Sequence, residues 1–279
     1  MCGIAGHIGP VALPPPRLQA AFRALHRRGP DARGLFQTHE GAAAVTLLHT
    51  RLAIIDLDRR SNQPFRRGDL TLVFNGEIYN HVELRRELEA QGARFATRSD
   101  TEVLLEAYRH WGDSCVDRLE GMWAFAIHDA DRHRLFLSRD PFGEKPLLWR
   151  NGPDGFHFAS EIACLAALSG ERPEVEQETV RRFLVNGYKS LYKSDALFHR
   201  GVKELPPGCN LTVGGNGDVE ITRYWRPRYA PEAAMSFTEA VEGVRHHLSE
   251  SMRLRLRADV PIAFCLSGGV ASAALASFA

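Results

Sequence analysis

The sequence has 279 residues, of which 44% are hydrophobic and 9% aromatic, and these proportions are typical of a globular protein with a large core. The formal net charge of +1 creates no field that would attract a polyanion, so nucleic acid and membrane surfaces are excluded as expected partners. No apolar run approaches the ~20 residues that cross a bilayer, and no signal peptide precedes Cys2, so a cytoplasmic location is expected.

A cysteine follows the initiator methionine directly. Removal of Met1 would leave the thiol and a free α-amine on the same residue, Cys2, and an amine with a pKa of roughly 7.7 to 8.0 can accept the thiol proton. Cys2 is therefore a candidate nucleophile with its own base, although a cysteine at this position can also be incidental. The five cysteines are scattered and include no C-x-x-C pair, so we expect neither a disulfide framework nor a metal site.

Short strands separated by turns are predicted along the first 225 residues. They are runs of β-branched, aromatic or aliphatic residues at 3–8, 45–49, 70–74, 122–128, 135–138 and 156–159. One helix is predicted over 82–91, and another follows the capping box formed by Ser99 and Glu102. The prolines at 14–16 predict an ordinary loop. This pattern predicts an α+β sandwich of two antiparallel sheets with helices outside.

The pattern changes after residue 225. Ser236 and Glu239 form a second capping box, and apolar residues at 240, 244, 248, 252 and 256 predict a long amphipathic helix. The apolar run 260–266 predicts a buried parallel strand, which Ser267-Gly268-Gly269 and a further helix follow. We therefore expect one domain over 2–225. Residues 226–279 would be a linker, a helix and the first βα unit of a nucleotide-binding domain.

Several polar residues of the first domain suit chemistry at an amide. A thiolate that attacks an amide carbon needs donors for the oxyanion, and Asn75-Gly76 offers a carboxamide and an unhindered N–H. Taken alone, Asn-Gly is also a common hairpin turn. Arg51 suits bidentate binding of a carboxylate, or is simply a solvated side chain. Asp100 suits binding of an ammonium group, or only complements a helix dipole.

Ten spaced motifs, taken together, resemble one family. They are Cys2-Gly3-Ile4-Ala5-Gly6, Arg28-Gly29-Pro30-Asp31, the segment 51–57, Asn62-Gln63-Pro64-Phe65, the segment 75–81, Ser99-Asp100-Thr101-Glu102, the segment 139–147, Phe158-Ala159-Ser160-Glu161, the segment 204–208 and Ser267-Gly268-Gly269. The chain resembles the N-terminal part of a glutamine-dependent asparagine synthetase, whose amidotransferase half is a class II glutaminase. The resemblance implies the four-layer αββα sandwich of N-terminal-nucleophile hydrolases.

The resemblance also implies roles for particular residues. Catalysis would use Cys2 as the nucleophile with its α-amine as base, and Asn75 and Gly76 as the oxyanion hole. Three groups of residues would bind glutamine. The α-carboxylate would be bound by Arg51 and the backbone of Leu52, Ala53, Ile54 and Ile55. The α-ammonium would be bound by Glu77 and Asp100, and the side-chain amide by Asn75 and Gly76. Lys145, within a tight turn, is interpreted as structural. Glutamine hydrolysis in this family needs no cofactor.

The second half of such synthetases uses ATP and Mg²⁺ to amidate aspartate with the ammonia. A remnant of its nucleotide site is expected at Leu266, Ser267, Gly268, Gly269 and Ser272. Ala271 stands where the family has an acidic residue, and an alanine cannot coordinate a cation. Residues 260–279 are also too few to close a doubly wound sheet, so a hydrophobic edge should be exposed. Ligase activity of this chain is therefore doubtful.

Other functions remain open. The chain could be an inert remnant or a scaffold subunit, or a related amidotransferase with a different carboxylate acceptor. A phosphoribosyl or hexosamine amidotransferase is disfavoured by the Ser267-Gly268-Gly269 loop. An enzyme is favoured, because an inert scaffold has no physical need for all six of the residues Cys2, Arg51, Asn75, Gly76, Glu77 and Asp100. The expected partners are L-glutamine and a separately encoded synthetase domain, and a homodimer is compatible with the sequence.

Overall fold

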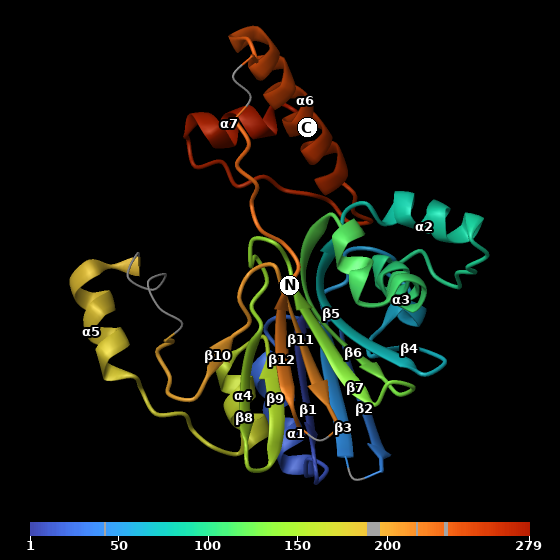
Figure 1. Ribbon diagram of the computed structural model, residues 1–279, viewed down its shortest axis with the longest axis vertical. Helices are drawn as coiled ribbons and strands as arrows, with labels where there is room; N and C mark the ends of the chain where they lie inside the picture. The colour runs from blue at the N-terminus through green and yellow to red at the C-terminus, as the bar shows by residue number, and fades with distance from the viewer. Residues whose placement is uncertain (42, 189–195, 216, 232–233) are drawn as a thin grey trace.

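The computed structural model describes residues 1–41, 43–188, 196–215, 217–231 and 234–279. Within these residues, two six-stranded antiparallel sheets pack face to face (Figure 1). The first sheet has the spatial order β10 (Lys203–Glu204), β8 (Leu148–Gly152), β9 (Gly155–Ala159), β1 (Gly3–Gly9), β3 (Ala43–Arg51) and β2 (Ala32–Glu40). The second has the order β12 (Val219–Arg223), β11 (Cys209–Gly214), β7 (Arg134–Arg139), β6 (Gly121–Asp129), β5 (Leu70–Ile78) and β4 (Phe65–Arg67).

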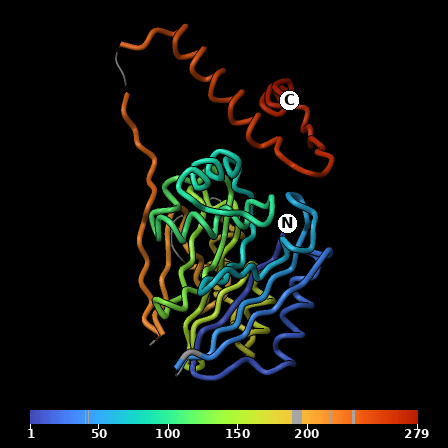
Figure 2. The backbone as a smooth tube through the Cα atoms, turned by 90° about the vertical axis from the view of Figure 1, so that its right-hand side faces the viewer, coloured from blue at the N-terminus to red at the C-terminus, as the bar shows by residue number. Residues whose placement is uncertain are grey.

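Helices cover the outer face of each sheet. The helices α1 (Pro15–Leu25) and α4 (Ile162–Ser169) pack on the first sheet through a shared apolar cluster. The helices α2 (His81–Ala90) and α3 (Asp100–Trp111), followed by the 3₁₀ turn η2 (Gly112–Arg118), pack on the second sheet. The four layers are helix, sheet, sheet and helix, and the tube in Figure 2 shows the two sheets from the side. The predicted four-layer sandwich is therefore the observed architecture.

The central strands are apolar on both faces because both faces are covered. In β1, Ile4 and Ile8 point between the sheets, where they join Val73 of β5. Ala5 points to the other face and packs under α1 and α4. Strands that are buried on both sides appear in a sequence as continuous apolar runs, which explains why the six predicted strands coincide with β1, β3, β5, β6, β7 and β9. Burial of this kind fixes the position of both strands, and with them Cys2, directly before β1, and Asn75, inside β5.

Two local predictions are wrong. Asn75-Gly76 is not a turn but lies inside β5, where Asn75 pairs with Ala124 and Gly76 with Trp123 of β6. The prolines at 14–16 do not form a simple loop, because α1 begins at Pro15. Proline is tolerated in the first helical turn, since the N–H that it lacks has no partner within the helix there.

The C-terminal region forms helices but no strand. The capping box of Ser236 and Glu239 begins α6 (Phe237–Arg255), as predicted. The predicted strand at 260–266 is absent, because no described strand lies beside this segment to pair with it. Its apolar side chains are exposed, as expected for an uncovered edge, and Leu266 is 62% exposed. A seven-residue helix, α7 (Val270–Ala276), follows.

Three further elements lie outside the four layers or in loops. They are the 3₁₀ turn η1 (Arg59–Ser61), the helix α5 (Gln177–Asn186) and the extended segment that leads to α6. Among the described residues, none of the helices combines the length and the apolar character needed to cross a bilayer.

Candidate active site

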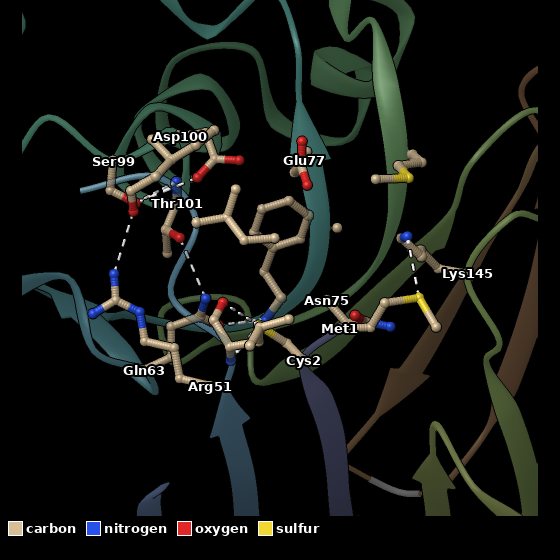
Figure 3. A pocket seen from close by; sticks show the side chains of 16 residues that line it. Met1, Cys2, Arg51, Gln63, Asn75, Glu77, Ser99, Asp100, Thr101 and Lys145 are labelled. Atoms are coloured by element: carbon tan, nitrogen blue, oxygen red, sulfur yellow. Dashed lines mark hydrogen bonds between the residues drawn. The ribbon is translucent and has the colours of Figure 1, made fainter. Parts of the chain in front are cut away.

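The predicted site residues surround one cavity between the start of β1 and the middle of β5 (Figure 3). The cavity is lined by Met1, Cys2, Arg51, Leu52, Ile54, Ile55, Gln63, Phe74, Asn75, Gly76, Glu77, Ser99, Asp100, Thr101, Met122 and Lys145. All predicted catalytic and glutamine-binding residues are in this set except Ala53. The N–H of Ala53 donates instead to the carboxylate of Asp31 at 2.8 Å, so Ala53 contributes to the shape of the loop.

Cys2 is held by contacts from two distant segments. Its sulfur accepts a hydrogen bond from the N–H of Leu52 at 3.4 Å, and its carbonyl oxygen accepts from Nε of Arg28 at 2.9 Å. Arg28 is itself paired with Glu161 at 2.6 Å. Burial raises the pKa of the Cys2 thiol, so ionisation requires a nearby base. The thiol is therefore positioned but not ionised in advance.

One edge of β5 faces the cavity and offers hydrogen-bond donors. The N–H of Phe74 donates to Oε1 of Gln63 at 2.6 Å, and the N–H of Ile78 donates to Asp100 at 3.1 Å. Because alternate N–H groups of a strand point the same way, the N–H of Gly76 lies on this same edge. A β-carbon at Gly76 would lie 2.1 Å from the Met122 carbonyl oxygen, so only glycine fits here.

Asn75 supplies a second donor. Its side chain is 1% exposed, and the amide nitrogen Nδ2 has no hydrogen-bond partner among the described residues. A buried polar group without a partner is costly and needs an explanation. An oxyanion that forms in the cavity would satisfy both Nδ2 of Asn75 and the N–H of Gly76.

Two carboxyl groups lie on the wall of the cavity that β5 and α3 form. Burial and the neighbouring charge of Asp100 raise the pKa of Glu77 to about 7, although Lys145 partly opposes the rise. Burial also raises the pKa of Asp100, whose carboxylate accepts hydrogen bonds at the start of α3. The buried carboxyl group of Asp100 and the half-buried one of Glu77 both resist ionisation, so together they form an attractive site for a cation such as an ammonium group.

The guanidinium group of Arg51 is directed at the loop 52–58. Its terminal nitrogens donate to the carbonyl oxygens of Asp58 at 2.9 Å, Ile55 at 3.3 Å and Asp56. One of them also donates to Oδ1 of Asn62 at 2.7 Å. The sequence predicts that the guanidinium group of Arg51 binds a substrate carboxylate, but in this structure the group donates its hydrogen bonds to protein oxygens. Arg51 therefore determines the conformation of the loop 52–58.

Three residues of the site are not singled out by the sequence. Gln63 joins β5 to α3, since its amide nitrogen also donates to Thr101 at 3.3 Å. Lys145 is interpreted as a turn residue, yet its ammonium nitrogen lies in the cavity 3.5 Å from the sulfur of Met1. Arg28 anchors Cys2. All three occur in motifs of the resemblance, which is the signal that could have marked them.

The expected nucleotide remnant lies away from this cavity. Ser267 and Ser272 approach each other with their hydroxyl oxygens 3.1 Å apart, and Gly268 has a φ of 80°. None of the residues of α7 is buried. The segment 260–279 contains no charged side chain, so it offers no carboxylate for a metal ion.

Comparisons with known proteins identify the family of this chain. Residues 1–225 match the family model described as a glutamine amidotransferase domain, and residues 243–279 match part of the model for asparagine synthase. The chain is 38% identical over 303 residues to a Mycobacterium tuberculosis protein that bears the name of a glutamine-hydrolysing asparagine synthetase, with coverage of 100% of this chain and 46% of the relative.

Two further relatives of the chain bear different names. Glutamine-hydrolysing asparagine synthetase 1 of Bacillus subtilis is 36% identical, with coverage of 90% of this chain and 39% of the relative. Amidase chyE of Penicillium rubens is also 36% identical, with coverage of 93% and 38%. The chain therefore spans less than half the length of these curated relatives.

Solved structures share the fold at low sequence identity. The glutamine phosphoribosylpyrophosphate amidotransferase of B. subtilis matches with a TM-score of 0.59 and 22% identity, over 81% of this chain and 50% of that chain. This likeness confirms the N-terminal-nucleophile sandwich that the resemblance implies. Because the domain model also matches most of the sequence, the chain belongs to the glutamine amidotransferase family, and its relatives there include proteins named as glutamine-hydrolysing asparagine synthetases.

Proposed function

We propose that the chain hydrolyses L-glutamine to glutamate and ammonia at Cys2. The observation that supports this most strongly is the cavity itself. It combines a positioned thiol, an unpartnered buried amide donor on Asn75, and the carboxyl groups of Glu77 and Asp100. These groups complement the three polar parts of glutamine on which the reaction depends, and an inert scaffold would gain nothing from their burial.

The proposed reaction begins when Met1 is removed and the α-amine of Cys2 becomes free. The amine accepts the thiol proton, and the sulfur attacks the γ-amide carbon of glutamine. The carbonyl oxygen becomes an oxyanion, which Nδ2 of Asn75 and the N–H of Gly76 stabilise. The C–N bond then breaks, and the proton passes to the leaving nitrogen, so that ammonia departs. Water hydrolyses the resulting thioester, releasing glutamate and restoring the thiol.

Substrate orientation would come from the two ends of the cavity. Glu77 and Asp100 bind the α-ammonium, and this binding removes the unfavourable buried negative charge of the free site. The α-carboxylate binds at the loop 52–55 beside Arg51, as the family resemblance implies. Because the ammonium and the carboxylate are bonded to the same α-carbon, this pair of contacts would favour an α-amino acid with a side-chain amide over a simple amide.

We further propose that the ammonia serves ATP-dependent amidation of aspartate to asparagine by a synthetase domain, of which residues 243–279 match a part. The residues at 266–272 do not fit a magnesium–nucleotide complex by themselves. Proteins usually bind Mg²⁺ through one or two carboxylates together with substrate phosphates and water. The segment around Ala271 contains no Asp or Glu side chain. In the proposed reaction glutamine hydrolysis needs no ATP, Mg²⁺ or other cofactor, as the family resemblance implies, whereas ligation requires residues beyond those at 260–279.

The experiment incubates the purified chain with glutamine, aspartate, ATP and Mg²⁺ and measures glutamate, asparagine and pyrophosphate together. We expect glutamate without asparagine or pyrophosphate. Cys2→Ala should abolish glutamate release, whereas the matched variant Cys265→Ala, at an exposed cysteine, should not alter it. Asparagine that forms in step with pyrophosphate would contradict the assignment of residues 260–279, and absence of glutamate from the wild-type chain would contradict glutamine hydrolysis.

A different acceptor is the second candidate. The amidase name of the P. rubens relative shows that names other than asparagine synthetase occur at the same level of identity. If an aspartate-specific synthetase domain supplied in trans forms no product, the same assay with other carboxylates would identify the acceptor. The glutaminase half would be unchanged by that outcome.

A further inference from the structure

The segment 257–259 makes direct contact with the loop beside the glutamine cavity. The backbone N–H of Asp259 donates to the carbonyl oxygen of Ile54 at 2.9 Å. The carboxylate of Asp259 accepts a hydrogen bond from the backbone N–H of Asp56 at 2.7 Å, across 203 positions of sequence. Asp259, in the C-terminal region, thus forms two hydrogen bonds with the loop 52–58 of the amidotransferase sandwich.

Asp56 links this contact to both ends of the cavity. Its carbonyl oxygen accepts a hydrogen bond from Arg51, and its carboxylate accepts from the backbone N–H of Arg98 at 2.7 Å. Arg98 lies two residues before Asp100, at the end of the cavity that we assign to the ammonium group. Any displacement of Asp56 would therefore disturb the loop that Arg51 shapes and the approach to α3 together.

The backbone of Asp56 needs such support. Its φ of 49° lies in the left-handed region, which costs free energy for a residue with a side chain. Strained residues persist when surrounding contacts determine them, and the charged hydrogen bond from the N–H of Asp56 to Asp259 is one of these contacts. Without it, relaxed conformations of the loop would gain population.

Arg257 forms a second anchor for the same segment. Its guanidinium group binds Glu83 of α2 through two contacts of 2.5 Å, and it donates to the carbonyl oxygen of Tyr79 at 2.6 Å. Arg255 lies over the ring of Tyr79. The C-terminal end of α6 is thus attached where β5 passes into α2, as Figure 1 shows, and Asp259 is held near Asp56.

We propose that Asp259 is a positioning residue for glutamine, which holds the loop 52–58 in the conformation that binds the substrate carboxylate. This inference rests on the proposed function, because it assigns a role at the same cavity. When only a fraction of the molecules has the competent loop, the apparent dissociation constant rises by the inverse of that fraction. Asp259 therefore acts on affinity, whereas the chemical step at Cys2 and Asn75 is left unchanged.

The experiment measures glutamine binding by calorimetry in a Cys2→Ala background, so that no hydrolysis occurs. We expect Asp259→Ala to raise the dissociation constant about five- to tenfold, the effect of losing one charge-assisted hydrogen bond at a partly exposed site. Asp259→Asn retains an oxygen acceptor and should recover most of the affinity. Arg253→Gln is the matched control, since Arg253 is an exposed side chain whose ion pair is with Glu250 on its own helix.

Two more readouts separate positioning from general stability. With Cys2 intact, Asp259→Ala should raise KM by the same factor and leave kcat within about twofold. Hydrogen exchange of the Asp56 amide should accelerate, while exchange in the strand β6 stays unchanged. Equal affinity for glutamine with and without Asp259→Ala, or a fall in kcat at constant KM, would overturn the inference.

Failure of the proposed function would look different. A wild-type chain that binds glutamine but releases no glutamate would overturn hydrolysis and leave the affinity test of Asp259 intact. Absence of glutamine binding in every protein tested would overturn both, because the loop would then have no substrate to position.

Discussion

Replacement of Glu77 by glutamine should stabilise the folded chain while it weakens glutamine binding. Burial beside Asp100 raises the pKa of Glu77 from its ordinary 4.5 to about 7, so the ionised side chain is less favourable in the folded than in the unfolded state. A carboxyl with a raised pKa contributes no cost well below pH 4.5, where both states are protonated. The cost grows as pH rises and is complete above pH 7, where both states are ionised.

The size of the effect follows from this difference. The rise in the pKa from 4.5 to about 7 corresponds to about 3.5 kcal/mol at about 1.4 kcal/mol per unit, as an upper bound for a fully buried group. Glu77 is only half-buried, and solvent screening reduces the expected gain for Glu77→Gln to about 1–2 kcal/mol at pH 8. At pH 5 only about a quarter of that gain should remain, because folded Glu77 is then largely protonated.

Urea denaturation at pH 8 and pH 5 measures these free energies of unfolding. The matched control is Glu144→Gln, which removes the same charge from an exposed residue near Lys145 and should change stability by less than about 0.5 kcal/mol at both pH values. The Cys2→Ala variant with Glu77 intact should lose glutamine affinity below pH 7, by up to about tenfold for each pH unit. The reason is that the carboxyl group of Glu77 must be ionised to bind the ammonium group. Equal stability of Glu77→Gln and wild type at pH 8 would refute this reasoning.

Three other substitutions test the remaining parts of the site. Cys2→Ala should abolish glutamate release without lowering the melting temperature, and mass spectrometry of the active protein should show that Met1 is missing; an active chain that retains Met1 would contradict the proposed base. Asn75→Ala should lower kcat by about 10²–10³ with little change in KM, since its donor acts only on the oxyanion, and a normal kcat would move the oxyanion hole elsewhere. Arg51→Lys should raise KM at least about tenfold and accelerate amide exchange in the loop 52–58, because an ammonium group cannot reproduce the four contacts of the planar fork; an unchanged KM would show that the loop does not depend on Arg51.

Most of the elements that the sequence predicts correctly are buried on both faces or begin at a side-chain cap, whereas α2 is recognised without either feature. β5 and β1 are continuous apolar runs, and Ser99 and Ser236 mark helix starts by their own chemistry. Strands at the sheet edges escape prediction. β2 (Ala32–Glu40) alternates partly buried and exposed positions over 32–39 and includes polar residues, so its sequence differs little from that of a loop. An apolar run alone was insufficient at 260–266, since a strand exists only when another strand pairs with it.

Short motifs predict which residue types occur in the site, but they do not predict which of these residues form hydrogen bonds with one another. Gln63 appears as an ordinary polar residue before a proline, and its importance arises because β5 and α3 meet at its side chain. The same holds for Asp56, whose partners Arg51, Arg98 and Asp259 come from three separate segments. No periodicity or spacing encodes such a meeting point, because it depends on how the layers pack.

The position of Asp56 has a consequence for communication between the two parts of the chain. If Asp259 favours the loop conformation that binds glutamine, thermodynamic linkage requires glutamine to favour docking of the segment 257–259 by the same factor. The segment continues directly into residues 260–279, which match part of the asparagine synthase model. Occupancy of the glutamine cavity would thus be transmitted to the start of that region through the two hydrogen bonds at Asp259. A loop with a strained residue at its centre is suited to this role, because its conformation depends on the contacts that hold the strained residue in place.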